Sequence, residues 1–304
     1  MRQWSHFPQD NSDRAVRRWL QTTLEESGAP FSSDERECRA IAERLMAGLD
    51  DRHRAMLEAL DRRYDEGELD RLGSWLDRVL SGEPVQYAVG WTEFRGLRLA
   101  CGSAALIPRP ETEEVVAWFI EGLDRWVESR GHEGAVRVVD MGTGTGCIAL
   151  AIKAARPRWE VWGLDVSESA LSLARANGEA MGLEVHWMQG DLLSGDMEGL
   201  PESVNGMVSN PPYIPKGERA SMSAHVRDNE PALALFVPDE DPLCFYRALF
   251  TQAGELLRDG GCLVAECHFQ FTRGVADCWQ LEAVETEVLS DLQGAERAVR
   301  QIRH

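Results

Sequence analysis

The N-terminal part of the chain carries its apolar residues at the spacing of amphipathic helices. The helical runs cover, in order, residues 14–24, 32–49, 56–60 and 72–80. Ser32-Ser33-Asp34-Glu35 has the pattern of a capping box before the second run, and Gly82 ends the last one. The pattern predicts a small helical domain over residues 1–82, which serves either as packing for the rest of the chain or as a grip for a macromolecular partner.

The pattern changes over residues 83–106, where apolar and polar residues alternate around Gly96. Such alternation is typical of a β-hairpin, so we expect a hairpin linker. Next comes Ile107-Pro108-Arg109-Pro110-Glu111-Thr112-Glu113, stiffened by its prolines, before a predicted helix over residues 114–130. The charged residues of this segment have two interpretations, a wall near the entrance of a site or a helix N-terminus with ion pairs. These residues are Arg109, Glu111 and Glu113.

Beyond Gly134, short apolar and β-branched runs alternate with helical patterns. Strands are predicted at residues 136–140, 160–165, 185–188, 204–209 and 261–266, and helices at 147–155, 168–181 and 242–257. Two further strands, at 283–289 and 298–302, are expected to be antiparallel at the sheet edge. This alternation is typical of a parallel sheet with helices on both faces. The sequence therefore predicts an α/β domain over residues 107–304, with a mostly parallel seven-stranded sheet.

A glycine-rich loop, Asp140-Met141-Gly142-Thr143-Gly144-Thr145-Gly146, joins the first predicted strand to its helix. Glycine allows a sharp turn and a close approach of the backbone to a ligand. The third glycine of the dinucleotide fingerprint is replaced by Cys147, and no lysine follows as in a P-loop. Asp165 ends the next strand, where a carboxylate can accept hydrogen bonds from both hydroxyls of a ribose. The alternative role is a helix N-cap, which Ser167 can supply instead. Loop and acid together favour a nucleoside-type ligand.

The third predicted strand is followed by Asp191 and Leu192. In this sheet order, the end of the third strand borders the base of a bound nucleoside. We expect Asp191 to accept a hydrogen bond from an exocyclic amine and Leu192 to pack on the purine face. The alternative, that both are ordinary turn residues, remains open.

The fourth predicted strand ends in Asn210-Pro211-Pro212-Tyr213. The Asn210 side-chain oxygen and the Pro211 carbonyl can accept both N–H bonds of a planar amide or aromatic amine, and the Tyr213 ring can stack on it. Such acceptors make the nitrogen a better nucleophile, because its lone pair is otherwise delocalised into the neighbouring π system. Proline fixes the backbone, so Pro212 keeps the turn rigid. The simpler interpretation is a strand that ends in a proline turn.

The amino-acid composition argues against several classes of protein. The chain has 304 residues, 43% hydrophobic residues and a formal net charge of −19, which argues against broad nucleic-acid binding through basic residues. No run is long and apolar enough for a membrane span. The seven cysteines and seven histidines are dispersed without metal-ligand spacing, so we expect no metal, reduced thiols and a cytoplasmic location. A monomer is the default expectation.

These motifs resemble the HemK/PrmC family of class I methyltransferases, which use S-adenosylmethionine. The specific signal is the run from Ile107 to Glu113. The Asp140–Gly146 loop, Asp165, Asn210–Tyr213 and the closing Asp291-Leu292-Gln293-Gly294 extend the resemblance over most of the chain. The chain departs from the family after Glu266, where Cys267-His268-Phe269 replaces the usual Ile-Gly pair.

The resemblance implies methylation of the glutamine side-chain nitrogen in the Gly-Gly-Gln motif of class 1 peptide chain release factors, with S-adenosylhomocysteine as the other product. It implies a Rossmann-like methyltransferase domain and an N-terminal substrate-binding bundle. The loop Gly142–Gly146 is then expected to hold the methionine part of the cofactor, with Asp165, Asp191, Leu192 and Asn210 completing its site. Two rival functions stay open, methylation of a ribosomal-protein glutamine and adenine-N6 methylation of DNA. A nucleoside-binding module without catalysis is a third alternative.

Overall fold

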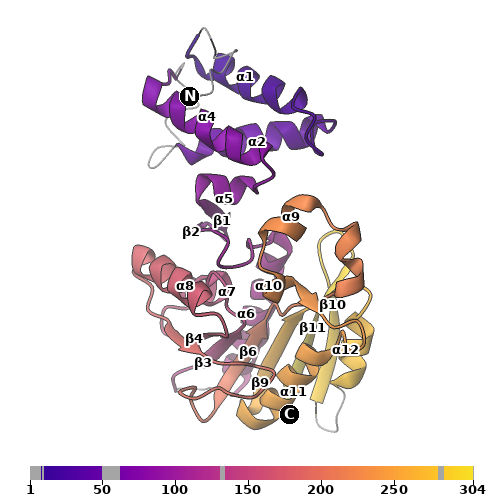
Figure 1. Cartoon of the computed structure of the whole chain (residues 1–304). Coiled ribbons are helices and arrows are strands. Elements are labelled where there is room, and N and C mark those ends of the chain that lie inside the picture. Colours follow the sequence, from indigo (N-terminus) through magenta and orange to yellow (C-terminus); the bar gives the residue numbers. More distant parts are fainter. Residues whose placement is uncertain (1–7, 9, 50–61, 131–133, 280–283, 304) are drawn as a thin grey trace. The chain divides into compact units, whose positions relative to one another are not determined.

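The structure is a computed structural model that describes residues 8, 10–49, 62–130, 134–279 and 284–303 (Figure 1). The chain divides into two compact units. Unit 1 comprises Met1–Trp91 with Ser223–Asn229, and unit 2 comprises Thr92–Met222 with Glu230–His304.

Unit 1 is helical, as the apolar spacing predicts. Its helices are α1 (Asp13–Glu25), α2 (Glu35–Gly48), α4 (Glu66–Leu80), α5 (Val85–Val89) and α9 (Ala224–Asn229). Leu20, Leu45 and Leu72 are fully buried in a core that joins α1, α2 and α4. The helix predicted at residues 56–60 lies outside the described residues.

The capping prediction for α2 was wrong in its detail. Asp34, not Ser32, is the N-cap residue, and its carboxylate accepts hydrogen bonds from the backbone N–H groups of Arg36 and Glu37. A single carboxylate oxygen thus satisfies two of the unpaired amides at the start of the helix. The reciprocal capping box occurs instead at α4, between Asp65 and Glu68.

Unit 2 is built on a seven-stranded sheet in the order β10-β11-β9-β6-β3-β4-β5. The strands are β3 (Arg137–Met141), β4 (Glu160–Asp165), β5 (His186–Gln189), β6 (Val204–Ser209), β9 (Leu257–Glu266), β10 (Val284–Ser290) and β11 (Glu296–Arg303). Neighbours from β9 to β5 are parallel, whereas β11 is antiparallel to both β9 and β10. The predicted mostly parallel α/β sheet is confirmed. β9 begins four residues earlier than predicted, since Leu257 already pairs with Val204 ahead of an irregularity in the register.

Helices cover both faces of this sheet. They are α6 (Pro110–Arg130), α7 (Cys147–Ala155), α8 (Glu168–Met181), α11 (Cys244–Leu256) and α12 (Thr272–Cys278). The other elements of unit 2 are α10 (Ala232–Leu235), the 3-10 helix η1 (Lys216–Ser221) and the short strands β7 (Ile214–Pro215) and β8 (Phe236–Val237). Successive strand residues join opposite cores, because side chains alternate along a strand. Val138 and Val208 pack with α6 and α7, whereas Val139 and Met207 pack with α11 and α12.

α6 starts at Pro110, four residues before the predicted position. Proline fits the first turn of a helix, because its fixed φ is helical and its missing N–H would have no partner there. Ahead of α6, β1 (Trp91–Phe94) and β2 (Leu97–Ala100) form the predicted hairpin. Its turn residues Arg95 and Gly96 have φ of 48° and 76°, as a two-residue hairpin turn requires.

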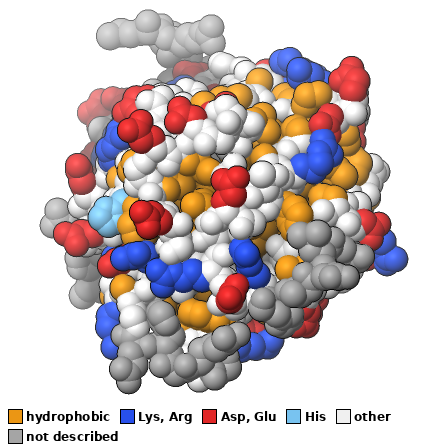
Figure 2. Space-filling model, turned by 90° about the horizontal axis from the view of Figure 1, so that it is seen from below, with side chains coloured by type: hydrophobic (Ala, Val, Ile, Leu, Met, Phe, Trp, Pro, Cys, Tyr) orange, Lys and Arg blue, Asp and Glu red, His pale blue; other side chains and the backbone are white. Residues whose placement is uncertain are grey.

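Acidic side chains are dispersed over the described part of one face of the molecule. Figure 2 shows one face of the molecule, on which Asp and Glu side chains lie among Arg, Lys and hydrophobic ones, without a broad basic patch on the coloured part. Among the described residues, no helix combines the length and the apolar character that crossing a lipid bilayer would require.

Candidate active site

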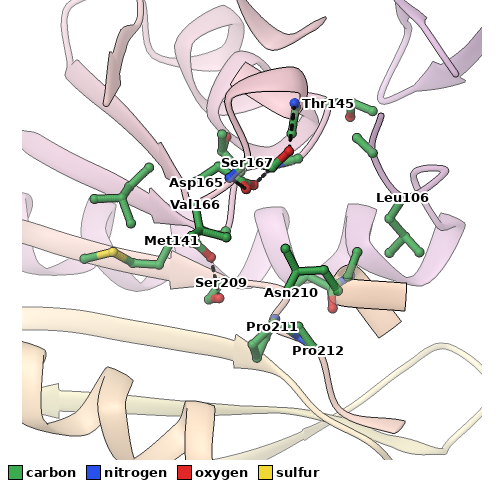
Figure 3. Close-up of a pocket in the computed structure, with 18 of the residues that line it drawn as sticks. Leu106, Met141, Thr145, Asp165, Val166, Ser167, Ser209, Asn210, Pro211 and Pro212 are labelled. Carbon is green, nitrogen blue, oxygen red and sulfur yellow. Dashed lines mark hydrogen bonds between the residues drawn. The ribbon is translucent and has the colours of Figure 1, made fainter. Parts of the chain in front are cut away.

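A cavity of about 260 Å³ opens at the carboxyl ends of the parallel strands in unit 2. It is lined by the glycine loop after β3, by the ends of β4, β5 and β6, by the segment before α6, and by residues of α10 and α11. In Figure 3, Asp165–Ser167 and Asn210–Pro212 come from two strand ends, with Met141 and Ser209 between them. Strand order places this cavity where open α/β sheets bind ligands.

The glycine loop is held in shape by backbone hydrogen bonds. Gly142, Gly144 and Gly146 have φ of 78°, 55° and 82°, a region that other residues rarely adopt. The Gly142 and Thr143 N–H groups donate to the Leu164 carbonyl over 2.8 and 2.9 Å, which ties the loop to the end of β4. Residues 142–145 line the cavity, as expected for a ligand-binding loop.

Gly146 has a packing role, and its predicted contact with the cofactor stays a prediction. It is not among the residues that line the cavity. A Cβ at this position would lie 2.8 Å from the Trp187 ring and 3.1 Å from the Ala174 side chain. Glycine is needed here because α7 starts in close contact with the residues around β5 and α8.

We predict that Gly146→Ala destabilises the fold more than Gly182→Ala. Both glycines have positive φ, but nothing lies within 4 Å of a Cβ at Gly182. Each variant therefore incurs the left-handed cost of about 1–2 kcal/mol, and Gly146→Ala adds an overpacking cost of about 1–3 kcal/mol. Urea unfolding of the two variants measures the difference. Equal losses would show that the Trp187 contact relaxes freely.

Asp140 lies fully buried beneath the loop. Its Oδ2 accepts hydrogen bonds from the Thr143 hydroxyl at 2.6 Å and from the Ala149 N–H at 3.2 Å. Burial raises the pKa of this carboxyl to about 7, because the ionised form loses its hydration. Asp140 thus supports the loop from below and carries a proton in part of the physiological pH range.

This raised pKa predicts a pH-dependent stability. The folded-state pKa lies above the unfolded value, so folding takes up a proton between about pH 4 and pH 7 and the contribution of Asp140 falls as the pH rises. In Asp140→Asn, the decline of the free energy of unfolding over this window should be shallower, by up to about 1.4 kcal/mol per pH unit. Chemical unfolding at matched ionic strength between pH 5 and pH 8 tests it. Parallel curves for the two proteins would contradict the assignment.

Asp165 stands at the end of β4 and lines the cavity. Its two oxygens accept hydrogen bonds from the Gly144 N–H at 2.8 Å and the Ser167 N–H at 2.9 Å. Burial raises the pKa of this carboxyl. A carboxylate has further lone pairs, so two protein donors leave it able to accept from a ligand. Ser167 is the N-cap of α8, so the capping role does not fall to Asp165 alone.

Asp191 and Leu192 follow β5 and also line the cavity. Asp191 Oδ1 accepts from the Leu193 N–H at 2.9 Å, and its backbone pairs with Asp196. Asp191 is therefore a turn residue and a cavity residue at once. Leu192 is 8% exposed, whereas Val166 and Leu193 at the same rim are 44% and 50% exposed, which gives this side of the cavity an apolar wall.

Asn210 directly follows β6, and only the nitrogen end of its carboxamide has a hydrogen-bond partner among the described residues. Its Nδ2 donates to the Thr112 hydroxyl at 3.1 Å. Its Oδ1 is buried and has no hydrogen-bond partner among the residues that the structure describes. Asn210, Pro211 and Pro212 all line the cavity (Figure 3). A buried acceptor without a partner is costly, so its presence beside a cavity indicates a ligand donor.

Tyr213 lies beside the cavity residues but is not itself among those that line it. Its hydroxyl donates to Glu266 Oε1 at 3.3 Å. Burial and the neighbouring Glu266 carboxylate raise the pKa of this phenol, so it stays protonated. Its ring is tilted against His268 with the centroids 6.1 Å apart. The stacking role predicted for Tyr213 remains a prediction.

The charged residues around the start of α6 do not all have the same role. Arg109 lines the cavity and pairs with Glu230, whose side chain is 1% exposed, over 2.6 Å. Glu113 accepts from the Arg95 N–H and so holds the hairpin turn. Arg109 therefore fits the wall interpretation, and Glu113 fits the structural one. Glu111 is not among the cavity residues.

Sequence reasoning missed three residues that organise the site. Thr112 bonds Asn210, Glu266 bonds Thr112 and Tyr213, and Glu230 bonds both Arg109 and the Ile107 N–H. The two residues in each of these contacts are far apart in the sequence. Only the position of Glu266 at the end of an apolar strand signalled a buried acid.

Comparisons with known proteins identify the family of this chain. A family model described as "Methyltransferase small domain" matches residues 126–227. The release factor glutamine methyltransferase of Bacteroides thetaiotaomicron is 37% identical over 222 residues, which are 72% of this chain and 76% of that protein. The protein of the same name from Deinococcus radiodurans is 40% identical over 225 residues, 74% of this chain and 76% of its own.

Among solved structures, a release-factor-specific protein-(glutamine-N5) methyltransferase from Alicyclobacillus acidocaldarius matches 68% of this chain and 99% of its own, with 25% identity and a TM-score of 0.40. The family assignment depends on the sequence relatives, whose identity extends over most of both chains. This chain belongs to the family of release factor glutamine methyltransferases.

Proposed function

We propose that this protein transfers a methyl group from S-adenosylmethionine to the side-chain nitrogen of the glutamine in the Gly-Gly-Gln motif of class 1 peptide chain release factors. The observation that carries the proposal is the buried, unpartnered Oδ1 of Asn210 at the wall of the cavity. A primary carboxamide has the N–H donors that this oxygen lacks.

The residues around the cavity fit the cofactor. The loop Gly142–Thr145 brings backbone without side-chain bulk to one wall, Asp165 offers free lone pairs for ribose hydroxyls, and Val166, Leu192 and Leu193 form an apolar wall suited to an adenine ring. Asp191 stands at the same wall as an acceptor for the exocyclic amine. When bound, S-adenosylmethionine supplies an electrophilic methyl group on a positively charged sulfur.

The role of the chain is to orient the target amide. We propose that Asn210 Oδ1 and the Pro211 carbonyl accept its two N–H bonds, while Pro212 keeps the turn rigid and Tyr213 supports the amide plane. Such orientation is worth on the order of 7–11 kcal/mol in well-aligned reactions. Methylation makes the amide nitrogen acidic, so its proton can pass to a neighbouring acceptor or to water without a strong base.

The N-terminal bundle is proposed to bind the release factor. Residues 1–82 contribute helices with their own buried core and lie outside the unit that holds the cavity. A domain of this kind supplies contacts to parts of a protein substrate that are remote from the glutamine.

The proposal is tested with methyl-labelled S-adenosylmethionine and three purified acceptors, which are a class 1 release factor, ribosomal protein and DNA. Mass spectrometry locates the label. We expect it on the glutamine of Gly-Gly-Gln, and a release factor with Gln→Ala at this position should remain unlabelled. Label on DNA or on ribosomal protein alone would refute the proposed substrate.

A further inference from the structure

Two buried side chains, Thr112 and Glu266, extend a chain of hydrogen bonds from Asn210. Asn210 Nδ2 donates to the Thr112 hydroxyl at 3.1 Å, and that hydroxyl donates to Glu266 Oε2 at 2.6 Å. Thr112 and Glu266 are each 1% exposed. The chain links the start of α6, the end of β6 and the end of β9, which are far apart in the sequence.

The direction of these hydrogen bonds follows from the chemistry of a hydroxyl. Thr112 has a single hydroxyl hydrogen. Burial raises the pKa of the Glu266 carboxyl to about 7, so above this pH the group is mostly ionised and can only accept. The hydrogen therefore points to Glu266, and the Thr112 oxygen is left to accept. Only the nitrogen end of the Asn210 carboxamide can donate to it. The oxygen end is then turned away from Thr112, and no described residue donates a hydrogen bond to it.

We propose that Thr112, held by Glu266, is the positioning residue that turns the Asn210 side-chain oxygen toward the target amide. This inference rests on the proposed function, because it assigns the cause of the orientation that the proposed reaction needs. A carboxamide can rotate by half a turn at little steric cost, since its oxygen and nitrogen are nearly the same size. Without a partner of defined polarity, Asn210 would present its N–H groups, which repel the N–H groups of the substrate.

Glu266 extends the effect to Tyr213. Its Oε1 accepts from the Tyr213 hydroxyl, while its Oε2 accepts from Thr112. The Tyr246 hydroxyl donates to the Glu266 backbone carbonyl at 3.1 Å and fixes the main chain at this point. One buried carboxylate thus holds both side chains that flank the predicted position of the substrate amide.

The test compares Thr112→Val with Thr112→Ser in the full-length protein. Valine keeps the shape but has no hydroxyl, whereas serine keeps the hydroxyl. With the release factor as substrate, we expect kcat to fall about ten- to hundredfold in Thr112→Val, as for a misoriented reactive group. We expect Thr112→Ser to recover most of the activity. The dissociation constant of S-adenosylhomocysteine, measured by calorimetry, should stay within about twofold in both variants.

A matched control exists in α12. Thr272 is also 1% exposed, and its hydroxyl donates to Glu296 Oε2 at 2.5 Å, but neither residue lines the cavity. Thr272→Val removes a partly buried Thr–Glu hydrogen bond, whose Glu296 side chain is 32% exposed, and should leave kcat unchanged. If Thr112→Val and Thr272→Val lowered kcat equally, the effect would be general destabilisation and the inference would be wrong.

A double-mutant cycle tests the part played by Glu266. Residues that act in one chain of contacts are not additive. Glu266→Gln combined with Thr112→Val should therefore reduce kcat little beyond the more impaired single variant. Fully additive losses would remove Glu266 from the positioning of Asn210.

Crystal structures of Thr112→Val and Thr112→Ser decide the inference without any activity measurement. We expect the Asn210 side chain to keep its place in the serine variant and to be rotated or displaced in the valine variant. An unchanged Asn210 in both variants would overturn the inference. Failure of the wild-type protein to methylate a release factor would overturn the proposed function instead, so the two failures are distinct.

Discussion

Replacing Asn210 by alanine is expected to lower kcat by at least about a hundredfold, the loss typical of one well-placed transition-state hydrogen bond. The buried Oδ1 of Asn210 has no partner among the described residues, so the fold loses only the Nδ2 bond to Thr112, whereas the substrate amide loses its acceptor. The dissociation constant of the cofactor should change far less. Single-turnover kinetics with a release factor and calorimetry with S-adenosylhomocysteine measure the two quantities separately.

Asn205 offers a matched control on the same strand. It is fully buried at the opposite end of β6, where its Oδ1 accepts from the Arg137 N–H at 2.8 Å. Asn205→Ala removes the same chemical group without touching the cavity, so kcat should persist while stability falls. Near-normal turnover in Asn210→Ala would show that another group binds the substrate amide.

Replacing Asp165 by alanine is expected to weaken cofactor binding by about 1.5–3 kcal/mol, the value of hydrogen bonds to a charged acceptor. This corresponds to roughly a ten- to hundredfold increase in the dissociation constant. The variant loses the hydrogen bonds to the cofactor and also the bond from the Gly144 N–H, which helps to shape the glycine loop. At saturating cofactor, kcat should fall much less than the affinity.

The control for this variant is Glu160→Ala. Glu160 begins β4, pairs with Arg137 near the surface and lies at the opposite end of the strand from Asp165. Its loss removes a carboxylate from the same strand without changing the cavity. Unchanged calorimetric affinity in Asp165→Ala, or an equal loss in Glu160→Ala, would exclude Asp165 from the cofactor site.

The local elements could be predicted well from the sequence. The predicted bounds of α7, α8, β4 and β6 agree with the structure, because each depends on short-range periodicity and on nearby stop signals. The errors occurred at helix starts, where two neighbouring residues could each begin or cap the helix. α6 took Pro110 as its first residue, and Asp34 replaced Ser32 as the cap of α2.

The candidate site could also be predicted only in part from the sequence. Parallel strands bring their carboxyl ends to one edge of a sheet, so the predicted positions of Gly142, Asp165, Asp191 and Asn210 converge on one cavity. Gly146, which was predicted as part of the cofactor loop, also packs closely against Trp187. That contact joins separate strands and helices and leaves no periodic trace in the sequence.

By itself, the sequence determined the alternation of strands and helices, the glycine loop and the chemical types at the strand ends. These are properties of neighbours along the chain. The tertiary structure alone decided which end of the Asn210 carboxamide bonds to Thr112, since the Thr112 and Glu266 side chains that orient it come from other elements. Hydrogen-bond direction depends on partners in space, and distance along the sequence says nothing about them.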